Sequence, residues 1–273
     1  MRIFIGFIAI ILSMLSCSRS IPIMERPSVH KTKYTDESKS FLLCKNCKAL
    51  NAIDDADKDK ITELGIYDRS CKIPSSLLDL INLKELSIFA QKVRLPDGKD
   101  GLENLEVFNA YDSHLPSIPA FVYQCKQLTR MVVGLTDGNS IDENISNLQK
   151  LEHLTLAFQN LDSLESGIFE LRNLRELVVR TDDGTRISLA ENIVELEQLT
   201  LLEMPIDVST HIDLLAQLTN LKKLVVPGIA CSNGDYSHLE RINFLEEIHV
   251  QELPDDLDGI KSHLKNINVV QAN

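Results

Sequence analysis

The sequence predicts an α/β solenoid, a fold in which units of one short strand and one helical turn stack into a single curved body. The first observation is an apolar pattern that recurs along the chain: Leu, two residues, Leu or a substitute, one residue, and a further apolar residue. Successive copies lie 19 to 25 residues apart, and a nearly fixed period of this size is typical of repeat architectures. The central residues of the copies are Leu64, Leu86, Phe108, Met131, Leu154, Leu177, Leu202, Leu224, Ile248 and Ile267.

The second observation is that each copy divides into a strand and a helical turn. Apolar and polar residues alternate over 151–156, which predicts a short strand. Apolar residues then recur at spacings of three and four, at Leu164, Ile168, Leu171 and Leu174, which predicts a helical or 3-10 turn. Strands stack about 4.8 Å apart only if every unit returns to the same place, so we expect a parallel sheet with one strand per repeat.

This pattern resembles the leucine-rich repeat family over about 210 of the 273 residues. The resemblance implies a horseshoe with a concave parallel sheet, convex helical or 3-10 turns and about ten repeats, which fill the domain 61–273. The family usually places Asn three residues after the second apolar strand position, where its amide bonds the neighbouring loop. None of the corresponding residues here is Asn, so we expect an irregular loop ladder; they are Arg69, Gln91, Ser113, Thr136, Gln159, Asp182, Asp207, Ile229 and Leu253.

The segment 41–60 precedes the first repeat and is predicted to form an N-terminal cap helix. Leu42, Leu43, Ala49, Leu50 and Ile53 have the spacing of a short amphipathic helix. A terminal repeat exposes its apolar core to water unless something covers it. We therefore expect this helix to close the open end of the solenoid.

The segment 1–16 is predicted to be a signal peptide. Arg2 is followed by an apolar run over 3–15, which is too short for a membrane-spanning helix. The run leads into Ser16-Cys17, which resembles the lipobox of bacterial lipoproteins and implies lipidation of Cys17. The alternative is ordinary secretory cleavage nearby, with Cys17 incidental. The polar segment 17–40 is predicted to be a flexible tether, and the protein is then expected in the cell envelope, lipid-anchored to a bacterial membrane and facing the periplasm or the exterior.

Composition and motifs argue against several classes of function. The formal net charge is −12 and no basic stripe is present, so we expect no nucleic acid partner and no contact with a membrane except through the lipid anchor. The sequence contains no phosphate-cradling glycine-rich loop, no HExxH and no GxSxG. The acidic stretch 54–59 lacks the Gly and Glu of a calcium loop. We expect no enzymatic activity, no cofactor and no metal.

Three cysteines near the N-terminal end of the solenoid are candidates for a disulfide. Cys44 and Cys47 form a CxxC pair in the predicted cap, and Cys71 lies in the first repeat loop. No βαβ redox context and no second CxxC accompany them. Extracytoplasmic chemistry permits a bridge from the cap to Cys71 that would pin the cap to the repeats, and the pairing stays open.

Aromatic residues are concentrated in the early repeats, on the face that residues between the core leucines are expected to present. Tyr67, Phe89 and Tyr111 occupy the same position in three consecutive repeats, which predicts a continuous aromatic strip. The predicted acidic border of this strip consists of Glu63, Glu85, Asp68 and Asp112. Aromatic faces and carboxylates together suit a cationic peptide segment or a sugar. The alternative is that the stacked rings only rigidify the sheet.

These observations favour a non-enzymatic, membrane-anchored binding module. It is expected to recognise a protein or peptide, or a glycan, through its concave face. The alternative is a structural or self-assembling cell-envelope protein without a dedicated ligand.

Overall fold

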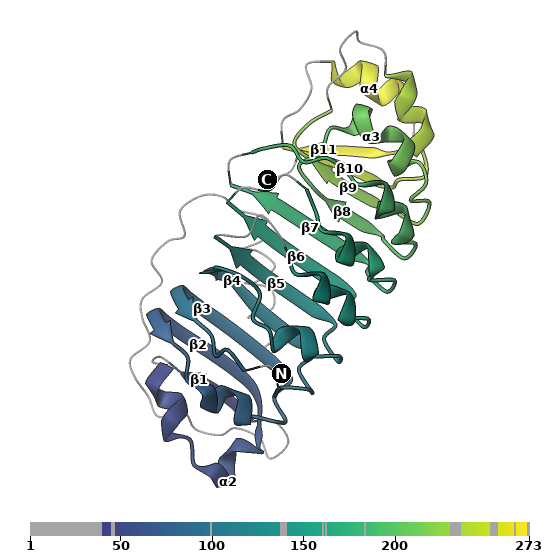
Figure 1. Cartoon of the computed structure of the whole chain (residues 1–273). Helices are drawn as coiled ribbons and strands as arrows, with labels where there is room; N and C mark the ends of the chain where they lie inside the picture. The colour runs from purple at the N-terminus through teal and green to yellow at the C-terminus, as the bar shows by residue number, and fades with distance from the viewer. Residues whose placement is uncertain are drawn as a thin grey trace.

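The computed structural model describes residues 40–44, 47–98, 100–136, 141–159, 161, 163–182, 184–229, 236–251, 256–264 and 266–271. Within them, eleven strands form one parallel sheet in which every strand pairs with its neighbours in sequence (Figure 1). The strands are β1 (Ser40–Cys44), β2 (Ile61–Lys72), β3 (Glu85–Arg94), β4 (Val107–Leu115), β5 (Arg130–Leu135), β6 (His153–Phe158), β7 (Glu176–Thr181), β8 (Leu201–Glu203), β9 (Lys223–Val226), β10 (Glu247–Val250) and β11 (Asn268–Gln271).

Short helical segments connect the strands and lie along the opposite side of the core (Figure 1). Most of them are 3-10 turns: η1 (Cys47–Ala52), η2 (Ser75–Asp79), η3 (Val122–Gln124), η4 (Glu143–Asn147), η5 (Ser166–Glu170), η6 (Glu191–Glu195) and η7 (Ser237–Ile242). Three are α-helices: α2 (Asp55–Lys58), α3 (Val208–Leu215) and α4 (Leu257–His263). Side-chain caps start some of these segments, as where the Asp207 carboxylate accepts the backbone N–H groups of Ser209 and Thr210 at α3.

The core lies between the sheet and the helical turns, and the repeating leucines fill it. All ten predicted central residues are buried, and eight of them have no exposed side-chain surface. The α/β solenoid with a parallel sheet on one face and helical or 3-10 turns on the other is thus confirmed. The last repeat is the exception in register, because Val269 and not Ile267 pairs with Ile248. Ile267 matched the apolar pattern, but it lies one residue before β11 begins.

The predicted N-terminal cap helix is wrong over its first part. Residues Ser40–Cys44 form strand β1, which pairs parallel with β2 and sets Leu42 opposite Leu64 and Cys44 opposite Ile66. The helical content of this segment is confined to η1 and α2. Leu42 lies one repeat period before Leu64 and therefore begins a degenerate repeat, which extends the sheet by one strand instead of covering its end.

Strands β2 and β3 are longer than the later strands because they bend together around the edge of the solenoid. Ile66 and Ile88 point into the core from even-numbered positions, whereas Cys71 and Val93 do so from odd-numbered positions. Side chains alternate between the two sides of a strand, so this change means that each strand turns between these positions. The two strands stay paired beyond the bend, up to Lys72 opposite Arg94. We call the sheet surface that faces away from the core the concave face, and the surface beyond this bend the lateral edge.

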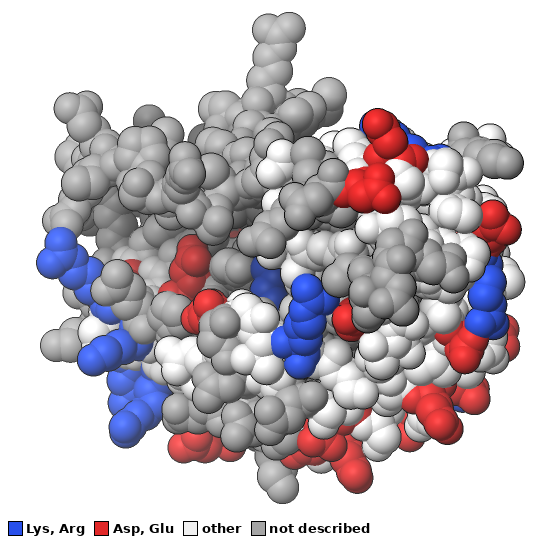
Figure 2. Space-filling model, turned by 90° about the horizontal axis from the view of Figure 1, so that it is seen from above, with Lys and Arg blue, Asp and Glu red and all other residues white. Residues whose placement is uncertain are grey.

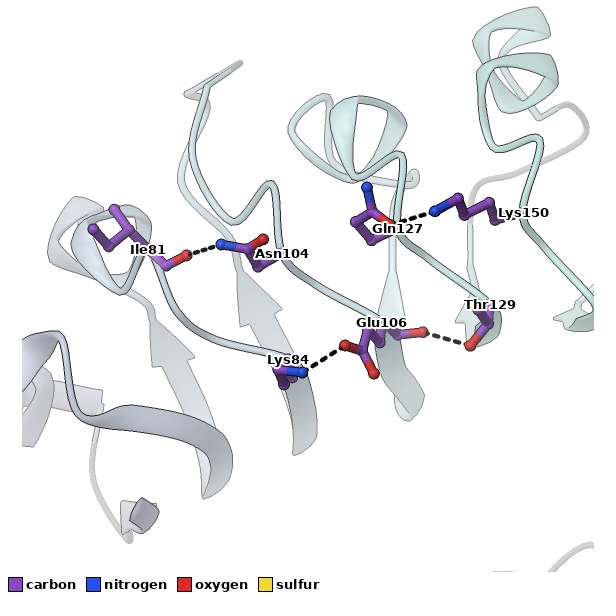
Figure 3. Close-up of polar contacts among 7 residues, drawn as sticks. All are labelled: Ile81, Lys84, Asn104, Glu106, Gln127, Thr129 and Lys150. Carbon is purple, nitrogen blue, oxygen red and sulfur yellow. Dashed lines mark hydrogen bonds and ion pairs between the residues drawn. The ribbon is translucent and has the colours of Figure 1, made fainter. Parts of the chain in front are cut away.

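Polar side chains link neighbouring repeats just before the strands (Figure 3). Asn104 Nδ2 donates to the carbonyl oxygen of Ile81 at 2.9 Å, and Lys150 Nζ donates to Gln127 Oε1 at 2.6 Å. Equivalent amide donors reach the preceding repeat from Asn82, Asn173 and Asn220. These asparagines form a ladder just before the strands, whereas the family resemblance implies an asparagine ladder just after them.

The loop positions that lack Asn are partly satisfied by other groups. Ser113 Oγ donates to the carbonyl oxygen of Ile88 at 2.8 Å, and Thr136 Oγ1 donates to that of Leu115 at 3.4 Å. Asp207 bonds its own helix instead of a neighbouring loop. The loop ladder is therefore irregular, as expected.

No helix in the described part of the chain is long and apolar enough to cross a membrane. The predicted signal peptide (1–16), Cys17 and most of the tether (17–40) lie outside the described residues.

Candidate functional site

The concave face of the first repeats carries a pair of stacked aromatic rings. Tyr67 on β2 and Phe89 on β3 are directly paired in register, because exactly one repeat separates them. Their ring centroids lie 4.5 Å apart with an angle of 17° between the planes. Both side chains are half-buried, and burial raises the pKa of the Tyr67 phenol. Because both rings are only half-buried, part of each stays accessible.

Tyr111 does not extend this stack as the sequence predicted. In the described part of the chain the ring contacts are Tyr67 with Phe89 and Phe108 with Phe121. Strand β4 pairs with β3 only as far as Ser87 opposite Asn109, and then bulges between Ala110 and Leu115. The predicted strip of three rings is therefore a pair, because the bulge takes Tyr111 out of the register on which the strip depends.

Tyr111 instead takes part in a polar group farther along the concave face. Its hydroxyl hydrogen-bonds the Arg180 guanidinium, which also donates from Nε to Glu203 Oε1 at 2.6 Å. Burial lowers the pKa of Arg180, but the hydrogen bonds to Glu203 and Tyr111 and the charge of Glu203 outweigh burial and raise it overall. Arg180 and Glu203 thus form a half-buried, hydrogen-bonded ion pair on neighbouring strands β7 and β8.

The sequence analysis did not predict the Arg180–Glu203 pair. An indication of it lies in the column of residues that occupy the same strand position as Tyr111 in successive repeats. Between Tyr111 and Arg180 this column holds only Gly134 and Ala157, which are paired in register on β5 and β6. A Cβ atom on Gly134 would lie 2.1 Å from the backbone carbonyl oxygen of Tyr111. Glycine is therefore required where the bulged β4 approaches β5, and the small residues leave the space in which two long side chains meet.

The four predicted acidic residues do not form one exposed border. Glu63 is only 7% exposed, so its prediction as an accessible ligand contact is wrong. Strand β1 explains this burial, since it adds a strand beside Glu63, whose register partners are Phe41 and Glu85. Glu85 is half-buried and Asp112 is exposed.

The fourth acidic residue, Asp68, belongs to the group around the disulfide. Its carboxylate accepts the backbone N–H of Cys47 at 3.4 Å, and Cys47 is disulfide-bonded to Cys71, which ties η1 to β2. Among the described residues, Cys47, Asp68 and Cys71 are the one group of possible ligands close enough to share a metal ion. Because both sulfur atoms are in the disulfide, this group offers no thiolate to a metal. Cys44 stays a buried thiol, and burial raises its pKa to about 11.

Comparison with known proteins identifies the fold. No model of a protein family matches the chain, and no curated protein matches it in sequence. Among solved structures, an internalin from Listeria monocytogenes superposes with a TM-score of 0.56 at 16% identity, over 79% of this chain and 62% of the internalin. A leucine-rich repeat protein from Leptospira interrogans superposes with a TM-score of 0.52 at 17% identity, over 86% of this chain and 72% of that one.

This chain thus spans less than two thirds of the internalin that it matches. At these identities the likeness concerns the fold, and it agrees with the repeat pattern, the single parallel sheet and the turns on the opposite side of the core. The chain has the fold of the leucine-rich repeat proteins.

Proposed function

We propose that this chain is a binding protein that recognises a protein or peptide through the N-terminal half of its concave face. The observation that carries the proposal is the stacked, half-buried pair of Tyr67 and Phe89. Aromatic residues are enriched at the centres of protein interfaces, because they bury a large area for few rotatable bonds. The pair is held on two paired strands, so it loses little conformational freedom when a ligand binds.

The charge around the pair favours a cationic segment as the ligand. Glu85 is half-buried on β3, the strand that carries Phe89, and Asp112 is exposed on the neighbouring β4. The whole chain has a formal net charge of −12. A Lys or Arg side chain over an aromatic face gains about 0.5–1 kcal/mol at an exposed site. The negative field of the chain also raises the encounter rate with basic partners. A sugar could stack on the same rings, and the experiment below separates the two ligands.

The proposal is tested by selecting peptides and then removing the rings. Random twelve-residue peptides are selected by display on the protein, and the selected peptides are measured by fluorescence anisotropy against Tyr67→Ala/Phe89→Ala. Loss of two central aromatic side chains is expected to weaken binding at least about tenfold. The matched control is Val178→Ala/Val225→Ala, which truncates two half-buried side chains on the concave face of β7 and β9.

The control variant is expected to bind like the wild type. Equal affinity of the wild type and the aromatic variant, with both folded, would refute the proposal. A glycan array that gives ring-dependent binding, with no peptide selected, would replace the peptide ligand by a sugar.

We also propose that Cys17 attaches the protein to a bacterial membrane through a lipid. The support is the sequence alone: the apolar run over 3–15, the Ser16-Cys17 pair that follows it and the polar tether beyond. Cys17→Ser is expected to abolish incorporation of a fatty-acid analogue and to release the protein from membranes. Incorporation that persists in this variant would contradict the lipid anchor.

A further inference from the structure

A group of cations gathers on the lateral edge, where β2 and β3 end. Lys72 is paired directly opposite Arg94, and Ser70 opposite Lys92. Side chains two residues apart in a strand point to the same side, so Lys92 and Arg94 share a surface with Lys72. All three are exposed, as is Arg69 at the bend. Figure 2 shows Lys and Arg gathered along the left edge of the molecule, the side on which β2 and β3 end in Figure 1. We call Lys72, Lys92 and Arg94 the basic patch.

The cations of the basic patch lie outside the described ion pairs that link neighbouring repeats. Several Lys and Arg side chains on other repeats face an acid on a neighbouring repeat, as in Lys84 with Glu106 at 2.9 Å (Figure 3) and Lys222 with Glu246 at 2.9 Å. Within the described ranges, no member of the basic patch has an ion-pair partner, and Lys72 faces another cation. Like charges directly opposite each other destabilise a sheet. A loss of stability from like charges, in a chain that is strongly acidic overall, indicates that the patch binds a negatively charged partner.

A cavity beside the patch indicates what else that partner carries. It has a volume of about 610 Å³, and Arg94 of the basic patch is one of its lining residues. Apolar side chains from the loops after β3 and β4 line much of it, among them Leu95, Pro96, Pro116 and Ile118. Its acidic members are Asp97, which is exposed, and Asp142, whose Oδ1 accepts the backbone and side-chain N–H groups of Asn144. The cavity can hold an apolar side chain next to the cations.

We propose that the basic patch and this cavity together bind an acidic, extended segment of a protein partner. Its carboxylates pair with Lys72, Lys92 and Arg94, and an apolar side chain enters the cavity. Acidic residues two apart in an extended segment lie about 6.6 Å from each other, which matches the spacing of Lys92 and Arg94 along β3. A sulfated glycan or a lipid headgroup would satisfy the cations but would leave the apolar lining unused. This site lies on the lateral edge and does not depend on the function proposed for the concave face.

The probe, called the Glu-Leu peptide, is a fluorescein-labelled ten-residue peptide of sequence Glu-Ser-Glu-Ser-Glu-Ser-Leu-Ser-Leu-Ser, measured by anisotropy at low salt. Its Glu and Leu residues occupy alternate positions, so they point to the same side of an extended chain. The patch variant is Lys72→Gln/Arg94→Gln. The matched control is Lys126→Gln/Lys261→Gln, which removes the same charge from two exposed lysines, one in the turn after η3 and one on α4. Loss of two exposed charge pairs is expected to weaken binding about fivefold, whereas the control variant binds like the wild type.

Three further arms decide between the occupants. The Gln-Leu peptide, in which Gln replaces every Glu, is expected not to bind. A peptide of the same charge with Ser in place of both Leu residues is expected to bind more weakly than the Glu-Leu peptide because it leaves the cavity empty. Equal affinities of the patch and control variants, or equal binding of the Gln-Leu peptide, would overturn the proposal. So would tighter, patch-dependent binding to phosphatidylglycerol vesicles or to a heparin fragment, which would assign the site to a membrane or a glycan. Circular dichroism checks that every variant is folded.

Discussion

Removal of the Cys47–Cys71 disulfide is expected to destabilise the N-terminal end of the solenoid. The two cysteines are 24 residues apart in sequence. Cross-linking a loop of this length lowers the entropy of the unfolded chain, and the loop-entropy relation gives about 3.5 kcal/mol at 25 °C. The variant Cys47→Ala/Cys71→Ala is therefore expected to lose about that free energy of unfolding.

The assay is urea denaturation followed by circular dichroism, with hydrogen exchange to locate the change. Repeats contact only their neighbours, so we expect exchange to increase first in β1, η1 and β2 and least in the distant β9. Reduced wild-type protein provides the control, because it keeps every side-chain atom and should match the variant. An unfolding free energy that changes by less than about 0.5 kcal/mol in both samples would refute the reasoning.

Three smaller perturbations test other parts of the account. Gly134→Ala is expected to cost about 1–3 kcal/mol or more in thermal unfolding, since the new Cβ meets the Tyr111 carbonyl oxygen at 2.1 Å; an unchanged midpoint would contradict this packing. Asn104→Ala is expected to cost about 0.5–1 kcal/mol because it removes the bond to the Ile81 carbonyl, and a cost near zero would mean that the asparagine ladder adds no stability. Burial lowers the pKa of His211 below 6.5, against the charge of a nearby aspartate, so the unfolded chain binds the proton more readily. Stability is therefore expected to fall as the pH drops from 6.5 through the folded pKa, and His211→Gln should remove this component in unfolding scans at pH 7 and 5.

The apolar period predicts the fold because every repeat must place the same side chains in one core. Leu154 and Leu177 are fully buried and paired in register, as their separation by one repeat requires. The pattern fails at the ends of the array, where fewer neighbours constrain it. Leu42 and Leu43 fit the helical spacing of the apolar residues over 41–60, yet Leu42 pairs with Leu64 in a strand, because the unpaired edge of β2 accepts a further strand.

The candidate site could be predicted only where the repeats stay in register. Tyr67 and Phe89 lie in two repeats of equal geometry, so their stacking follows from their spacing. Tyr111 shares that spacing but lies in the bulge between Ala110 and Leu115, which the periodic pattern does not predict. The prediction that Glu63 is accessible fails because β1, the strand that buries it, has the apolar spacing of a helix. Lys72 and Arg94 are also one repeat apart in sequence, but they lie beyond the predicted strands and were recognised as neighbours only because β2 and β3 stay paired past the bend.

The most direct test of the central claim is a photo-crosslink from the concave face. Phe89 is replaced by benzoylphenylalanine, and a peptide selected on the wild-type protein is added and irradiated. The same replacement at Phe244, a half-buried ring between η7 and β10, is the control. Binding through the stacked aromatic pair predicts a crosslinked peptide at position 89 and none at position 244. Efficient crosslinking at position 244, with none at position 89, would contradict recognition through the concave face of the early repeats.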